Sequence, residues 1–195
     1  MRKSIIVTVT NPETGEILFR KRIGKLPRIK SKDVDLGTNN WGRFLAVLLS
    51  GATASSNKSV TLIDTANTSK TTNVYAVTSS YIIFGNTNYS ALNVTIAVGD
   101  NPASPSRTDY NLKGTILAEV TVSSTYVDGS GIVNVTASFS FASAVTVYEI
   151  GLFMEMLYSS ASPYKFKTML DRTVVSDGIP VSVGQTLNIT YQIPI

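Results

Sequence analysis

Short apolar runs, separated by turn-forming residues, dominate the chain from residue 59 onward. Within many of them apolar and polar residues alternate, a pattern typical of strands with one buried face. Pairs such as Gly99-Asp100 and Asp177-Gly178 mark turns between the runs. The runs cover residues 60–63, 74–78, 81–84, 93–98, 115–122, 132–141, 145–157, 164–170, 179–183 and 187–193. Short strands separated in this way predict an all-β domain, a β-sandwich or jelly-roll-like fold, over residues 59–195.

The N-terminal residues predict a β-hairpin. Residues 4–10 and 16–23 are strand-like. Between them, Pro12 suits the second position of a turn and Gly15 tolerates a positive φ. Residues 24–32 are basic and interrupted by a proline, so they look like an extended arm.

One short helix is predicted at residues 41–49. Its apolar side chains fall at helical spacing, and Gly51 is placed to end it. The apolar positions are Trp41, Phe44, Leu45 and Leu48, preceded by possible N-cap side chains at Thr38, Asn39 and Asn40. We expect this helix to cap one end of the sandwich, with a small polar linker at residues 52–58.

Positive charge is concentrated near the N-terminus. The chain has 17 Lys and Arg and 13 Asp and Glu, but residues 1–32 hold nine of the cations and two of the acids. That segment therefore carries a net charge of +7, and the rest of the chain −3. On this basis the chain divides into a basic β-hairpin and arm at 1–32, a helix and linker at 33–58, and a β-sandwich domain at 59–195.

The basic segment is the candidate assembly surface. Its candidate side chains are Arg20, Lys21, Arg22, Lys25, Arg28 and Lys30. Strand alternation places Arg20 and Arg22 on one face, with Phe19, Lys21 and Ile23 on the other. We expect the segment to dock on an acidic neighbouring subunit. Two alternatives are contact with nucleic acid through phosphates and a solvated strand edge guarded by charge.

The absence of two residue types argues against enzymatic chemistry. The chain has no His and no Cys, so it lacks the commonest general base, the commonest metal ligand and any thiol nucleophile. Glu149 and Glu155 are six residues apart on one predicted strand, about 20 Å at ~3.3 Å per residue, too far for a glycosidase pair. The close acids Asp33 and Asp35 lack further calcium ligands and are interpreted as helix caps. We expect no catalytic residue, no metal site and no cofactor.

Two other groups of residues have candidate roles. Glu149 lies among β-formers, so it is expected either on the solvent face or paired, with Arg172 as partner in a sheet-surface salt bridge. Six N-x-Ser/Thr sequons occur, and Asn57 and Asn67 are the candidate glycosylation sites, because they fall in a predicted loop region.

Four phrases resemble virion structural proteins of tailed phages and archaeal viruses. They are residues 40–49 (NWGRFLAVLL), 96–100 (IAVGD) with the following Pro102, Pro105, Asp109, Tyr110 and Leu112, 148–153 (YEIGLF) with 170–173 (LDRT), and 179–193 (IPVSVGQTLNITYQI). The resemblance spans residues 40–193. It implies a β-sandwich subunit of a tail, nozzle, turret or capsid, without catalytic residues and located in the virion.

Composition agrees with an assembling protein. Ser, Thr and Asn number 59, and only 15% of residues are charged, which is a weak guard against association. We therefore expect a homo-oligomer that contacts other virion proteins and has no membrane span. The alternative function is a receptor- or glycan-binding module, with Tyr75, Tyr81, Tyr89, Tyr110, Tyr126 and Tyr158 lining a shallow site. No signal peptide is expected, because the basic start leads directly into an alternating strand.

Overall fold

The structure is a computed structural model, and it describes residues 4–24, 34–37, 39–40, 42–43, 58–77, 81–84, 93–122, 124–127, 132–157 and 165–194. These residues form strands β1 (Ser4–Thr10), β2 (Ile17–Ile23), β3 (Val34–Gly37), β4 (Lys58–Ile63), β5 (Ser69–Val77), β6 (Tyr81–Phe84), β7 (Val94–Gly99), β8 (Ile116–Val122), β9 (Ser124–Val127), β10 (Ile132–Ser140), β11 (Val145–Leu157), β12 (Lys165–Val181) and β13 (Thr186–Pro194).

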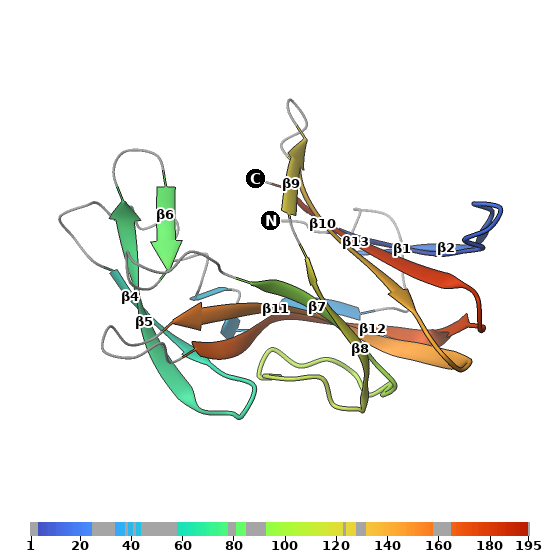
Figure 1. The fold of residues 1–195 in the computed structure, drawn as a ribbon. Helices are drawn as coiled ribbons and strands as arrows, with labels where there is room; N and C mark the ends of the chain where they lie inside the picture. The colour runs from blue at the N-terminus through green and yellow to red at the C-terminus, as the bar shows by residue number, and fades with distance from the viewer. Residues whose placement is uncertain are drawn as a thin grey trace.

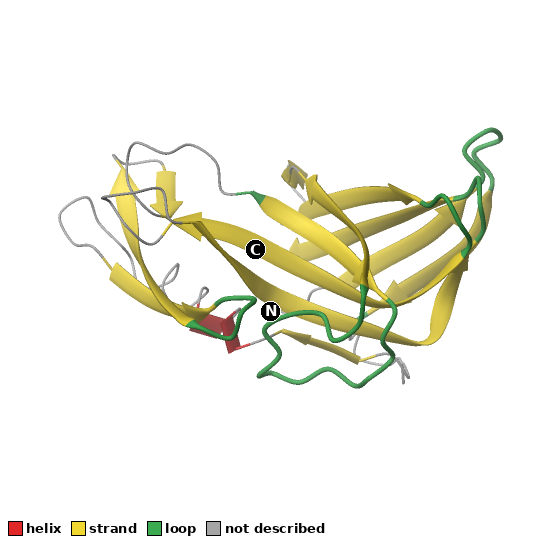
Figure 2. Ribbon diagram, turned by 60° about the horizontal axis from the view of Figure 1, so that its bottom comes forward, coloured by secondary structure: helices red, strands yellow, loops and turns green. Residues whose placement is uncertain are grey.

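Two five-stranded antiparallel sheets face each other. Sheet A has the order β2-β1-β13-β10-β9, and sheet B has the order β3-β12-β11-β7-β8 (Figures 1 and 2). Ile5 and Ile189 of sheet A pack in one core with Ile96 and Ile150 of sheet B, and all four are fully buried. The predicted all-β sandwich is confirmed.

Alternation along the strands explains how this core forms. On β10, Val135, Ala137 and Phe139 are buried, whereas Thr136 and Ser138 between them are exposed. Because successive side chains point to opposite faces, one face of sheet A is apolar and enters the core while the other is hydroxyl-rich.

The N-terminal hairpin belongs to the sandwich, and its separation from the rest of the chain was wrong. β1 lies inside sheet A, hydrogen-bonded to β2 on one side and to β13 on the other. Ile5, Val7, Val9 and Ile23 are at most 1% exposed and join the common core. The basic charge misled the prediction, because β1 itself carries no charged residue and presents an aliphatic face.

A third, three-stranded sheet with the order β4-β5-β6 lies at the far end of the long β11–β12 hairpin (Figure 1). It is joined to β12 by an isolated bridge between Asp64 and Thr168. The buried Asn40 amide reinforces this junction: its Nδ2 donates to Ile63 O at 2.8 Å and to Thr168 Oγ1 at 2.9 Å. Its Oδ1 accepts from the Ile63 N–H at 2.9 Å. Asn40 thus links β4 to β12, and does not cap a helix as expected.

Only the start of the predicted helix lies within the described residues. Asn39, Asn40, Gly42 and Arg43 have helical backbone, and the predicted apolar positions of residues 41 and 44–49 lie outside the described residues. Within the described part of the chain, no helix has the length and apolar character needed to cross a membrane.

Two further expectations need correction. Asp35 lies on β3, opposite Thr173 of β12, so the segment predicted as helix and linker contributes an edge strand of sheet B. Asp177-Gly178 was also expected to end a strand, but both residues lie within β12. The pairing of β12 with β11 shifts register at this point, between Val147 and Glu149 of β11. Gly178 has φ 69°, a conformation that glycine adopts without strain. The residues of β12 between Val174 and Ile179 form a bulge.

Candidate assembly interface

Strand β2 forms one edge of sheet A and carries three of the candidate assembly residues. Arg20 and Arg22 are exposed, and Lys21 is half-buried on the opposite face, as strand alternation predicted. Lys21 Nζ lies 3.8 Å from Asp177 Oδ2, and Arg22 Nη2 donates to Ser4 Oγ at 3.2 Å. Among the described residues, no strand pairs with the outer side of β2.

The start of β2 also exposes two adjacent aliphatic side chains. Ile17 is 53% exposed and Leu18 is 46% exposed. Because the β1–β2 register shifts between Val9 and Thr10, Leu18 has no direct partner on β1. A bulge at this point leaves both aliphatic groups at the rim of the sheet, next to the basic part of the strand. Charge reasoning alone missed this apolar component.

The other candidate residues are not brought to this edge. Lys25, Arg28 and Lys30, and the sequon Asn57, lie outside the described residues. Asn67 occupies an exposed turn with φ 61°, and its N–H donates to Asp64 O at 3.0 Å.

Four of the six tyrosines of the predicted shallow site lie within the described residues. Tyr110 is 37% exposed on the loop after β7. Tyr75 and Tyr81 lie on the paired strands β5 and β6, and Tyr126 lies on β9 of sheet A. Tyr89 and Tyr158 lie outside the described residues.

A buried ion cluster lies on the outer face of sheet B. Arg172 of β12 and Glu149 of β11 are fully buried, and Asp109 is 9% exposed. Arg172 Nε donates to Glu149 Oε2 at 2.8 Å, and Nη1 donates to Asp109 Oδ2 at 3.2 Å. Arg172 Nη2 lies 2.7 Å from Glu149 Oε2 without meeting hydrogen-bond geometry. The predicted pairing of Glu149 with Arg172 is confirmed, but its expected place on the sheet surface is wrong.

The loop at residues 100–115 buries this cluster. It lies against sheet B on the side away from sheet A (Figure 1). The N–H groups of Lys113 and Gly114 donate to the two carboxylate oxygens of Glu149 at 3.1 and 2.7 Å. Leu112 packs with Ala97, Phe153 and Met169 in a small apolar cluster on the same face. The loop is thus held by charge at one point and by apolar contact at another.

A glycine on the strand next to β11 makes room for the Glu149 side chain. Gly99 of β7 is directly opposite Glu149, and Gly151 of β11 is directly opposite Arg172. A Cβ atom on Gly99 would lie 2.7 Å from Glu149 Oε1. A strand glycine often marks close approach by another group. Glycines within predicted strands were visible in the sequence, and they indicate which face of sheet B is closely approached by another segment.

The arrangement anchors a loop and offers no accessible reactive group. Both carboxylates accept hydrogen bonds from Arg172 and from loop N–H groups, which include the Ser106 N–H, 2.7 Å from Asp109 Oδ2. Glu155, the other acid weighed on β11, accepts a hydrogen bond from Asn93 Nδ2 at 3.0 Å. The described residues contain no cluster of three or more groups suited to hold a metal ion.

Comparison of the chain with protein-family models, curated proteins and solved structures gave no match.

Proposed function

We propose that the protein is a non-enzymatic structural subunit that assembles with other copies, or with neighbouring proteins, through the edge of β2. The observation that carries this proposal is the combination at one strand of a sheet edge with which no described strand pairs, two exposed aliphatic side chains and exposed arginines. An added strand gains affinity from main-chain hydrogen bonds and specificity from side-chain contacts.

The charge of β2 restricts what can pair with it. If two copies paired antiparallel through β2 centred on Lys21, Arg20 of each copy would lie opposite Arg22 of the other, and Lys21 opposite Lys21. Like charges placed directly opposite each other destabilise a strand pair. The partner is therefore a neutral or acidic segment, and an assembly of identical copies uses a heterologous contact. Contacts of that kind form rings when the rotation closes.

A virus particle is the setting that we propose for this assembly, as a tail, nozzle, turret or capsid component. The support is the resemblance of the four phrases described above. Residues from two of these phrases meet in the ion cluster: Asp109 belongs to the phrase that begins at 96–100, and Glu149 and Arg172 belong to the phrase of 148–153 with 170–173. The residues that carry much of the resemblance thus build one structural unit, the anchored loop.

The test is the mass in solution of the full chain, measured by light scattering after size-exclusion chromatography. We expect an oligomer for the unchanged chain and a smaller species for the double variant Ile17→Lys, Leu18→Lys. The matched control is Ile116→Lys, since Ile116 is 42% exposed on β8, an edge strand of sheet B. An unchanged mass for the double variant, or dissociation by Ile116→Lys alone, would show that β2 is not the assembly edge.

A further inference from the structure

The outer face of sheet A is a continuous field of hydroxyl and amide side chains. It is formed by three adjacent strands, β1, β13 and β10, none of which contains a charged residue. We call it the hydroxyl face and define it by Thr8, Thr10, Thr136, Ser138, Asn188 and Thr190. All six are exposed or half-buried.

Hydrogen bonds between neighbouring strands hold these side chains in place. Thr136 Oγ1 and Thr190 Oγ1 are 3.1 Å apart, and Ser138 Oγ donates to Asn188 Oδ1 at 2.7 Å. Asn188 Nδ2 donates in turn to Thr10 Oγ1 at 3.2 Å. Each hydroxyl oxygen has two acceptor positions, so one such bond leaves capacity for a ligand. Because the side chains are already ordered, a ligand meets a smaller entropic cost on binding.

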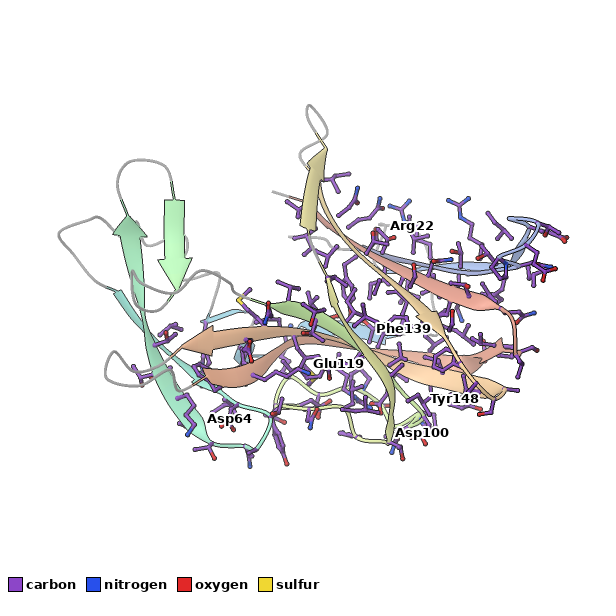
Figure 3. The ribbon with its side chains drawn as sticks, in the orientation of Figure 1. Arg22, Asp64, Asp100, Glu119, Phe139 and Tyr148 are labelled. Atoms are coloured by element: carbon purple, nitrogen blue, oxygen red, sulfur yellow. The ribbon has the colours of Figure 1, made fainter. Side chains whose placement is uncertain are left out.

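Two arginines border the hydroxyl face. Arg20 is directly opposite Thr8 on the neighbouring strand, and Arg22 is opposite Ile6. Arg22 Nη2 lies 3.2 Å from Ser4 Oγ and 3.5 Å from Gln192 Oε1, so its side chain reaches across β1 toward β13. Figure 3 places Arg22 on the outer side of sheet A, whereas Phe139 lies between the sheets. At two residues' separation the arginines are about 7 Å apart along the strand.

The chemistry of the hydroxyl face selects among classes of ligand. The centre of a protein interface is enriched in aromatic side chains, Met and Arg, and depleted in Ser, which makes three hydroxyl-rich strands poorly suited to a protein partner. Nucleic acid needs many cations for its phosphates, and here the cations lie only along one border. A carbohydrate offers hydroxyls that both donate and accept, and these match a field of hydroxyls and amides.

We propose that the hydroxyl face binds an anionic polysaccharide, with sugar hydroxyls on β1, β13 and β10 and carboxylate or sulfate groups on Arg20 and Arg22. Arginine suits both anions because its planar guanidinium donates in pairs. This proposal shares Arg20 and Arg22 with the proposed assembly edge. It differs in using hydroxyl and amide side chains on the face of the sheet, whereas the assembly edge uses the main chain of β2 with Ile17 and Leu18, so the threonine variant below tests it separately.

The test is retention of the full chain on immobilised dextran sulfate, with neutral dextran of equal size as the reference. We expect retention on the sulfated polymer only, and a decrease as salt is raised. The double variant Thr136→Val, Thr190→Val keeps side-chain shape and strand propensity but removes two hydroxyls. It should bind about tenfold more weakly, as expected from the loss of two hydrogen bonds. Arg22→Gln should weaken binding similarly.

The controls separate a built site from general attraction to a basic protein. Arg107 is exposed on the loop that covers sheet B, away from the hydroxyl face, so Arg107→Gln should leave retention unchanged. Equal weakening by Arg107→Gln and Arg22→Gln, or full retention of the threonine double variant, would overturn the proposal. Displacement by duplex DNA at equal charge concentration would also overturn it, because the surface would then attract any polyanion.

Discussion

Arg172 Nε and Glu149 Oε2 are joined by a 2.8 Å hydrogen bond on adjacent strands, and neither side chain is exposed to solvent. A charge taken out of water is tolerated when its partner and its hydrogen bonds are present. Here the partners come from β11, from β12 and from the loop at residues 100–115, so the pair couples the stability of that loop to the stability of sheet B.

Arg172→Met should be strongly destabilising. Methionine fills similar space but leaves the buried Glu149 carboxylate without its cation and Asp109 with Lys113 alone. Removing one partner of a buried pair costs about 3–5 kcal/mol. Urea unfolding followed by fluorescence measures the loss. As the control, Glu119→Gln breaks the solvent-accessible pair with Lys167 and should cost less than about 1 kcal/mol. Comparable losses in the two variants would contradict the role given to the buried cluster.

Gly99→Ala should destabilise the same unit by crowding. The added methyl would lie 2.7 Å from Glu149 Oε1, so the carboxylate must move away from the loop N–H groups. Overpacking of this kind costs about 1–3 kcal/mol. Thermal unfolding measures it. Gly42→Ala is the matched control, because Gly42 is helical with open space around it, and there alanine should be neutral or stabilising. Equal melting temperatures for Gly99→Ala and the unchanged chain would show that Glu149 has room to shift.

Asn40→Ala should loosen β4 locally. The Ile63 N–H donates to Asn40 Oδ1, so its exchange with solvent deuterium should accelerate when the acceptor is removed. Asn39→Ala is the control, since Asn39 is exposed and donates to Arg107 O through its main-chain N–H, which alanine keeps. Unchanged exchange at Ile63 in Asn40→Ala would mean that the bridge between Asp64 and Thr168 holds the junction alone.

Removal of residues 1–24 should abolish folding of the sandwich. The deletion takes two of the five strands from sheet A and opens a long edge on β13. The single change Ile5→Ala, at a fully buried position, should cost about 2–5 kcal/mol. Val183→Ala, at a side chain 64% exposed, should be close to neutral. A soluble truncated chain with a β-type circular dichroism spectrum would show that the hairpin is dispensable.

Features that depend on residues close together in the sequence were predicted correctly. The alternation of Val135, Ala137 and Phe139 with polar residues gave the strand and its buried face correctly. Burial of Arg172 was not predictable in this way, because it depends on Asp109, 63 positions earlier in the chain. The position of β1 inside sheet A likewise depends on pairing with β13, at the other end of the sequence. The assembly role of Arg20, Lys21 and Arg22 stays a prediction, as do the glycosylation sites.

The pairing of β1 with β13 has a consequence for biosynthesis. Ser4 and Gln192 are partners across sheet A although they are 188 positions apart. During synthesis β1 leaves the ribosome long before β13 does. Until β13 follows, the strand edge of β1 that pairs with β13 is open, and the aliphatic face formed by Ile5, Val7 and Val9 is not fully covered. Sheet A can therefore close only once β13 has been synthesised and has left the ribosome, and until then the nascent chain depends on dilution or on chaperones to avoid aggregation.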